Sequence, residues 1–557
     1  ISSLRRGFFI SNFIMSETRV IQRTEEAAQN VYAGLNGNAD FYSITEGTYN
    51  ASFALRNEVE EVLLSSGAQN MPAAFWSEEY ACQLYDVLTK NNCDAKLCAV
   101  ARSLLNSGKS SASMVRRKTG SGVSPRQATV PLLLEMMYGK KDMNNAINYT
   151  APNGSPEALD ALRILEGIST NDSDVYSTDN IFIVPGGATT GVSMTMDYIA
   201  DRFPRCELLT IGPSYFQFAR NARMLGLKQT MVVNEQVQER SNGQVRFLPT
   251  PSEIEKSINS CLKAIVITQP NNPTGEFYDE QELRQIITLA DENGLLIIDD
   301  AAFEDLVFPE YQSQFKSVAE VAREMGKLSC VVTIKSYSKG RNYPASRLGW
   351  IATTNTDYIE FANEYAMRKY DSPSVMVTGA VCLDALCRAV EMEFLRNKYE
   401  TIEGAVEKLA PLFPTDSVSL PVENPDIIKL YIKQRMEDRR QYKESFAAVM
   451  DAGGFDAVSS VRAAYNAIVR VDEVPDNISL LDLALTLFAR GGIESQWGPN
   501  FGGTDDEWRK NYGAWMRISF SSSAEYLIDG IGRSRLIINS LLENPDSTEK
   551  VQTNISM

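Results

Sequence analysis

Histidine is absent from all 557 residues of this chain. The absence removes the side chain that most often moves protons near neutral pH and the commonest protein ligand of metal ions. Acid or base chemistry must therefore use a lysine, tyrosine, cysteine or carboxylate whose pKa is shifted by its surroundings. We accordingly predict no metal site.

Positive charge and long apolar runs are also scarce. The 54 Lys and Arg residues are outnumbered by 71 Asp and Glu, which gives a net charge of −17, and 44% of the residues are hydrophobic. This balance is that of a globular chain large enough for more than one domain, and its acidity disfavours nucleic acid and anionic membranes as partners. No stretch approaches the roughly 20 apolar residues that span a bilayer. Ser11 and Asn12 interrupt the first apolar patch, so the beginning of the chain is a poor signal peptide.

The cysteines form no CxxC pair. Eight are present, at positions 82, 93, 98, 206, 261, 330, 382 and 387, and several lie in apolar runs. This distribution favours reduced thiols over a disulfide framework. A cytoplasmic location is therefore expected.

Two parts of the chain differ from the rest in their pattern. Residues 1 to about 106 show apolar residues at helical spacing, for example over 58–64 and 78–88, which predicts helices joined by polar loops. The segment 106–126 is rich in Ser, Gly and basic residues and suits a connection between domains. A polar tail over 544–557 is predicted to be disordered.

From about residue 155, short apolar runs alternate with longer amphipathic segments such as 280–293. The runs are Ile181–Val184, Leu208–Ile211, Thr230–Val233, Ala264–Thr268, Leu295–Ile298, Cys330–Ile334 and Leu348–Ala352. Nearly continuous apolarity in runs this short predicts strands covered on both faces, with helices as crossovers. We therefore expect an α/β fold with a mostly parallel, doubly wound sheet, whose ligands gather at the carboxyl ends of the strands.

The residues that follow these runs are unusual. Gly186 and Gly187 open a helix after the first run, where free backbone N–H groups could bind a phosphate, although an ordinary tight turn would look the same. Tyr215, in an aromatic segment after the second run, could face a planar ligand or pack in a core. Asp299 and Asp300 directly follow the fifth run, and a buried carboxylate there needs a cationic or hydrogen-bonding partner.

The sixth run is followed by a lysine with the features of a Schiff-base former. Lys339 ends the sequence Ser-Tyr-Ser-Lys, and Arg347 lies eight residues beyond it. A lysine partly desolvated at a strand end and close to other cations has a depressed pKa and can react with a carbonyl group. Taken alone, the same four residues could equally form a surface loop.

Together, these segments resemble the fold-type I pyridoxal 5′-phosphate (PLP) enzymes, specifically the class I/II aminotransferase superfamily. The resemblance covers about residues 125–541. The matching motifs are NPTG at Asn272–Gly275, Asp300-x-Ala-Phe303, SxSK at Ser336–Lys339 with Arg347, Arg517 within Trp515–Ser519, and the segment Asn148–Ser155.

The resemblance implies the PLP-dependent transferase fold, with a mostly parallel sheet in a large domain and a smaller α+β domain. The expected division is a helical N-terminal extension over 1–110, a PLP-binding domain over 155–394, and a small domain built from 111–154 and 395–557.

The resemblance also implies a role for each matching residue. Lys339 would hold PLP as a Schiff base and then move protons, while Asp300 would pair with the pyridine nitrogen. The remaining residues implied to bind cofactor are Gly187, Ala188, Thr189, Ser336, Ser338 and Arg347 around the phosphate, Tyr215 against the ring, Asn272 at its 3′ oxygen, and Phe303. Tyr149 would reach the phosphate of a neighbouring subunit, which implies a homodimer, and Arg517 with Asn272 would bind the substrate carboxylate.

Phe303 departs from the family, in which a tyrosine usually donates a hydrogen bond to the 3′ oxygen of the ring. One stabiliser of the phenolate is missing, so we expect a higher Schiff-base pKa than is usual.

The favoured function is transfer of an amino group between an L-amino acid and a 2-oxo acid. A decarboxylase or lyase on the same scaffold is the alternative, because aspartate 4-decarboxylases look similar in their long N-terminal extension, Gly-Gly turn and doubled aspartate. A transcription regulator with a helical DNA-binding extension is a third possibility. It is disfavoured because residues 1–100 carry 7 basic against 12 acidic residues, a net charge of −5.

Overall fold

The computed structural model describes residues 151–543, except 236–242, 342–343, 370–377, 415–424, 454, 456, 472, 492 and 522–523, together with a short strand at Val62–Leu63. The predictions for the rest of the N-terminal extension, for the 106–126 connection, for Tyr149 and for the 544–557 tail lie outside these residues.

A seven-stranded sheet forms the centre of the larger part of the molecule, in the order β2-β9-β8-β7-β6-β3-β4. Its strands are β2 (Ile181–Pro185), β3 (Glu207–Ile211), β4 (Lys228–Val232), β6 (Leu262–Thr268), β7 (Leu296–Asp300), β8 (Val331–Ser336) and β9 (Leu348–Ala352). All neighbours are parallel except β9, which is antiparallel to both β2 and β8. The predicted mostly parallel sheet is confirmed, and each predicted strand overlaps an observed one.

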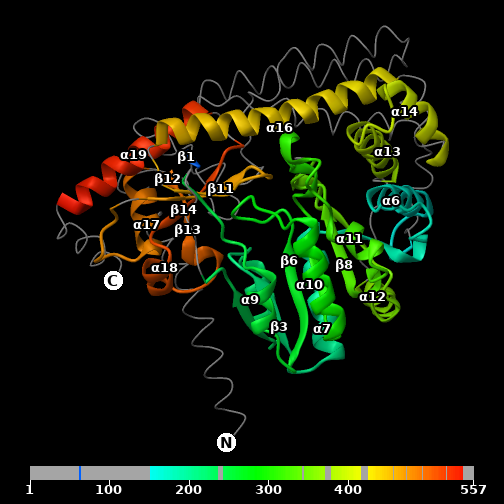
Figure 1. The fold of residues 1–557 in the computed structure, drawn as a ribbon, viewed down its shortest axis with the longest axis horizontal. Helices are drawn as coiled ribbons and strands as arrows, with labels where there is room; N and C mark the ends of the chain where they lie inside the picture. The colour runs from blue at the N-terminus through cyan, green and yellow to red at the C-terminus, as the bar shows by residue number, and fades with distance from the viewer. Residues whose placement is uncertain are drawn as a thin grey trace, which may run out of the picture.

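Helices cover both faces of this sheet (Figure 1). They are α6 (Pro156–Ser169), α7 (Ala188–Arg202), α8 (Gln217–Met224), α9 (Pro251–Lys256), α10 (Glu280–Glu292), α11 (Val318–Glu324), α12 (Thr356–Lys369), α13 (Thr378–Leu395) and α14 (Ile402–Leu409). Successive strand residues enter different cores: Ile265 packs in the core that contains α6, α10 and α13, whereas Val266 packs in the core that contains α7, α8 and α12. This alternation is the reason why the strands are apolar at almost every position.

Local sequence signals fix where several helices begin. Asp279 and Glu282 form a capping box at the start of α10, so that each side chain accepts a backbone N–H of the other residue. Pro156 occupies the first turn of α6, where its missing N–H costs no hydrogen bond. Gly187 precedes α7 with a φ of 75°, which a residue with a Cβ rarely adopts.

The smaller part is built on a five-stranded sheet in the order β13-β14-β11-β10-β5. Its strands are β5 (Gln244–Val245), β10 (Val458–Ser459), β11 (Asn466–Arg470), β13 (Gln496–Trp497) and β14 (Trp515–Ser519), and its helices are α17 (Leu480–Gly491), α18 (Asp505–Asn511) and α19 (Ala524–Glu543). The segment that forms β5 lies inside the predicted large domain, yet it pairs in parallel with β10.

One long helix, α16 (Pro425–Gly453), runs across both parts of the molecule (Figure 1). Near its beginning, Ile428 and Ile432 pack in the core of the larger part, whereas Tyr442 and Val449 pack in the core of the smaller part. The packing therefore changes within α16, about 40 residues after the boundary that the sequence suggested at residue 395.

The N-terminal segment differs from the prediction at one point. Val62–Leu63 form strand β1, which pairs in parallel with β12 (Ile493–Glu494), although the apolar spacing over 58–64 predicts a helix. Backbone hydrogen bonds to an available strand edge stabilise this segment more than a helix of only seven residues would. Within the described residues, no helix has the length and apolarity needed to cross a membrane.

Candidate active site

A cavity of about 440 Å³ lies where the carboxyl ends of the central strands meet one face of the smaller sheet. The predicted site residues that line it are Ala188, Thr189, Tyr215, Asn272, Asp300, Phe303, Ser336, Ser338, Lys339, Arg347 and Arg517. Gly187, which directly precedes α7, is not among the lining residues, and Tyr149 is outside the described residues. The structure thus brings together side chains that are up to 329 positions apart in the chain.

Lys339 lies in the turn that follows β8 and lines the cavity, where its side chain is partly buried. Its Nζ is 5.9 Å from the centre of the Phe303 ring. Burial, Arg517 and Arg347 lower the pKa of this lysine to about 8, and Asp300 opposes them only in part. A larger share of the amine is therefore neutral and nucleophilic near neutral pH than in an exposed lysine.

Asp300 is the last residue of β7 and faces the same cavity. Burial raises its pKa to about 6, while an N–H donated by Ala302 over 3.2 Å and the charge of Lys339 hold that pKa down. A cationic group placed beside this carboxylate would lower the pKa further and keep Asp300 ionised. The site therefore suits a ligand with a protonated ring nitrogen.

Asp299 points to the opposite face of the sheet, because successive strand residues alternate. The Thr333 hydroxyl donates to its Oδ2 over 3.0 Å, and burial raises the pKa of Asp299 well above the usual range. Only one of the two adjacent aspartates therefore belongs to the cavity. This arrangement fits the expectation that one of the pair faces a ligand.

The start of α7 and the turn after β8 form a pocket for an anion. Gly186, Ala188 and Thr189 line the cavity at the positive end of the α7 dipole. The Ser336 Oγ accepts the backbone N–H of Ser338 over 3.0 Å, and both serines line the cavity.

Arg347 borders the same pocket and donates a hydrogen bond to the carbonyl of Gly186. Backbone N–H groups, hydroxyls and one guanidinium are the donors that a phosphate dianion requires. With Asp300 and Lys339 nearby, the residues present fit PLP.

Arg517, from β14, enters the cavity from the smaller part. Its Nη1 donates to Asn272 Oδ1 over 3.1 Å, and its guanidinium lies 5.3 Å from the centre of the Phe501 ring. Burial lowers the pKa of Arg517 to about 10, against the opposing effects of Tyr465 and Glu494. A buried guanidinium with donors directed into a cavity is suited to bind a carboxylate through two parallel hydrogen bonds.

Four cavity residues from the smaller part were not predicted from the sequence: Asn466, Glu494, Gln496 and Phe501. Gln496 lies directly opposite Arg517 in the pairing of β13 with β14, and therefore shares its face of the sheet. Asn466 donates to the same Asn272 oxygen over 3.5 Å. Only the strand register reveals these neighbours, since no motif marks them in the sequence.

Metal binding finds no support among the described residues, where no group of three or more Cys, Asp or Glu side chains is arranged to hold an ion. Asp300 is the acid of the cavity whose charge raises the pKa of Lys339.

The aminotransferase class I and II family matches residues 124–411, more than half of the chain. The chain belongs to this family. The predicted family is thus confirmed. The match includes every motif from Asn148 to Arg347 and ends before Arg517.

Individual relatives are distant. A yeast protein named as a probable kynurenine–oxoglutarate transaminase (Saccharomyces cerevisiae) is 23% identical over 288 residues, which are 50% of this chain and 60% of the relative. The LL-diaminopimelate aminotransferase of Methanococcus maripaludis is 27% identical over 304 residues, 55% of this chain and 59% of the relative. The chain thus matches less than two thirds of the length of these two proteins.

Solved structures extend the likeness in fold. An aspartate aminotransferase from Thermus thermophilus superimposes with a TM-score of 0.54 and 16% sequence identity, covering 90% of this chain and 97% of that one. At this identity the likeness concerns the fold, and it confirms the expected fold-type I architecture.

Proposed function

We propose that this protein is a PLP-dependent aminotransferase that moves an amino group between an L-amino acid and a 2-oxo acid. The observation that carries the proposal is the convergence of Lys339, Asp300 and Arg517 on one cavity beside a pocket for phosphate. These three side chains come from two strand ends of the larger sheet and from a strand of the smaller sheet. They supply an amine, an acid and a carboxylate clamp.

PLP, when bound as a Schiff base with Lys339, supplies an electron sink that makes the substrate Cα–H bond acidic. Asp300 would keep the ring nitrogen protonated through a charge-assisted hydrogen bond. Arg517 would bind the substrate carboxylate, and its hydrogen bond to Asn272 Oδ1 aligns the two side chains for that task. Lys339 would carry the proton to and from the substrate Cα, for which a pKa of about 8 is well suited.

A decarboxylase or lyase on the same scaffold is less well supported. The doubled aspartate was one reason to consider it, but Asp299 faces away from the cavity and bonds to Thr333. The relatives are named as aminotransferases.

We also propose that the protein works as a homodimer in the cytoplasm. The family resemblance supports a dimer in which Tyr149 from a second copy completes the phosphate pocket. None of the five cysteines among the described residues forms a disulfide, which supports a reducing compartment.

A substrate panel tests the proposed activity. The purified protein with PLP is incubated with each L-amino acid and 2-oxoglutarate, and products are followed by mass spectrometry with a ¹⁵N-labelled donor. We expect ¹⁵N to appear in glutamate with at least one donor. Consumption of an amino acid with release of carbon dioxide and no labelled glutamate would contradict the proposal.

Replacing Phe303 by tyrosine is expected to lower the Schiff-base pKa. Phe303 is buried against Tyr465, with ring centres 5.5 Å apart, and brings no hydrogen-bond donor to the cavity. A hydroxyl there would stabilise the phenolate of the cofactor and so favour loss of the imine proton. Absorbance titration of both proteins measures the pKa, and an equal or higher value in Phe303→Tyr would contradict the expectation.

A further inference from the structure

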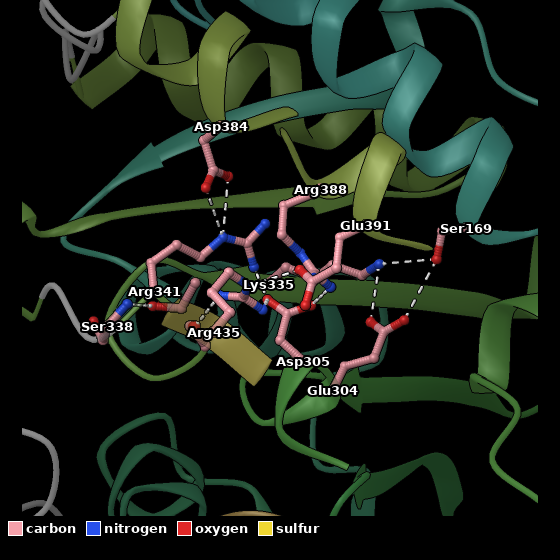
Figure 2. A network of polar contacts seen from close by, with 12 residues as sticks. Ser169, Glu304, Asp305, Lys335, Ser338, Arg341, Asp384, Arg388, Glu391 and Arg435 are labelled. Carbon is pink, nitrogen blue, oxygen red and sulfur yellow. Dashed lines mark hydrogen bonds and ion pairs between the residues drawn. The ribbon is translucent and has the colours of Figure 1, made fainter. Parts of the chain in front are cut away.

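A buried cluster of charged side chains includes Arg341 and contacts Gly340, the two residues that follow Lys339, and Figure 2 shows most of its members. We call it the Arg435 cluster. Its members are Arg341, Arg388, Arg435, Arg439, Asp305, Asp384 and Glu391. They come from the turn after β8, the segment after β7, α13 and α16, so four separate parts of the chain meet here.

Glu391 is the centre of the cluster and is fully buried. Its Oε2 pairs with Arg435 Nε at 2.7 Å, its Oε1 pairs with Arg439 Nη2 at 2.7 Å, and Arg388 also bonds to it. Burial would raise the pKa of Glu391, but Arg435 and Arg439 outweigh it and lower the pKa, so this carboxylate stays ionised.

The cluster has more guanidinium groups than carboxylates. Four arginines face three acids, a net charge of 4 − 3 = +1. Guanidinium N–H groups that find no carboxylate are stabilised by backbone acceptors, because an unpaired buried donor is costly. Two of them reach backbone carbonyls: Arg435 Nη1 donates to Gly340, and Arg439 Nη1 donates to Asp305 over 3.3 Å.

The backbone carbonyl to which Arg435 donates belongs to Gly340, the residue next to Lys339. Glycine is the residue with the widest choice of backbone conformations, so Gly340 cannot fix the direction of the turn by itself. A Cβ at this position would lie 2.7 Å from the Cβ of Asp305 and 2.9 Å from its Cγ. Gly340 is therefore held between Asp305 on one side and Arg435 on the other.

Arg341 anchors the other end of the turn. Its Nε bonds to Asp384 at 3.0 Å, a second nitrogen bonds to Asp305, and its guanidinium lies 5.4 Å from the ring centres of Tyr337 and Trp350. Both residues that follow Lys339 are thus tied to one buried cluster.

We propose that Arg435 is a positioning residue for Lys339: through the Gly340 carbonyl it holds the turn in the conformation that aims the lysine amine into the cavity. The inference rests on the proposed function. Through Arg435, helix α16, which packs in both cores, is linked to the turn that carries the reactive lysine.

Arg439 provides a matched control on the same helix. Like Arg435, it is buried and forms a 2.7 Å ion pair with Glu391, but its second hydrogen bond goes to the backbone carbonyl of Asp305 and not to the turn after Lys339. Arg435→Met and Arg439→Met should therefore lower the melting temperature alike. Only the first should disturb Lys339.

The experiment compares both variants with the wild type as PLP-loaded proteins. One readout is circular dichroism in the absorption band of the cofactor, which reports how the ring is held. The other is the rate of a single half-reaction at saturating amino acid. For Arg435→Met we expect an altered dichroism band and a rate at least about tenfold lower, with KM changed much less because Arg517 is intact. Arg439→Met should match the wild type in both.

Equal dichroism bands and equal rates in Arg435→Met and Arg439→Met would overturn the proposal. If Arg435→Met does not fold, Arg435→Lys decides: it keeps the charge but loses the planar geometry that spans Glu391 and Gly340. An intermediate rate supports the proposal, and wild-type rate and dichroism overturn it. If the wild type binds PLP but converts no amino acid, the proposed function fails, and the dichroism comparison still tests Arg435.

Discussion

Lys339→Ala is expected to lower turnover by about 10⁴-fold, the upper end of what a positioned general base contributes. The variant loses both the amine that forms the Schiff base and the group that moves the proton. The anion pocket and Asp300 remain, so PLP should still bind, but without the absorbance of a Schiff base. Steady-state rates and the cofactor spectrum measure the two effects.

Lys339→Arg serves as the control for charge. It keeps a cation in the cavity but forms no Schiff base, so it should be as inactive as Lys339→Ala. A small primary amine added to Lys339→Ala should restore part of the rate by supplying the missing base. Turnover above about 1% of wild type in either variant, without added amine, would contradict the role of Lys339.

Asp300→Asn is expected to lower turnover by about 10² to 10³-fold, the loss typical of removing one preorganised electrostatic partner. The amide has almost the shape of the carboxylate but cannot hold the ring nitrogen in its protonated form. The cofactor then becomes a weaker electron sink, and removal of the Cα proton slows. Half-reaction rates with a good amino-acid donor measure the loss.

Asp299→Asn is the matched control, since it makes the same chemical change one residue away on the opposite face of the sheet. Burial raises the pKa of Asp299 well above its usual range, which favours the neutral form of this side chain, so a neutral amide should replace it with little effect on turnover. A loss in Asp299→Asn as large as that in Asp300→Asn would show that the two aspartates do not differ in role.

The strands and most of the cavity could be predicted from the sequence for one physical reason. Strands covered on both faces must be apolar throughout, and in a parallel sheet their carboxyl ends meet at one edge, so the polar residues after each run converge. Asp300, Ser336 and Lys339 were found in this way. Which of Asp299 and Asp300 faces the cavity depends on the strand boundary, which composition does not fix.

Other features depend on contacts that leave no local signal. Gln496 and Asn466 reach the cavity through the register of short strands in the smaller sheet. The Arg435 cluster joins residues up to 134 positions apart, and α16 passes from one core to the other without a glycine or proline break before Gly453. A boundary inside a continuous helix cannot be read from its periodicity.

The most direct test of the central claim is the absorbance spectrum of the PLP-loaded protein after addition of an amino-acid donor in the absence of any 2-oxo acid. We predict that the Schiff-base band is replaced by that of pyridoxamine phosphate, and that a 2-oxo acid restores it, because the amino group stays on the cofactor until an acceptor arrives. A Schiff-base band that persists while the amino acid is consumed would contradict the account and assign the protein to decarboxylation or elimination.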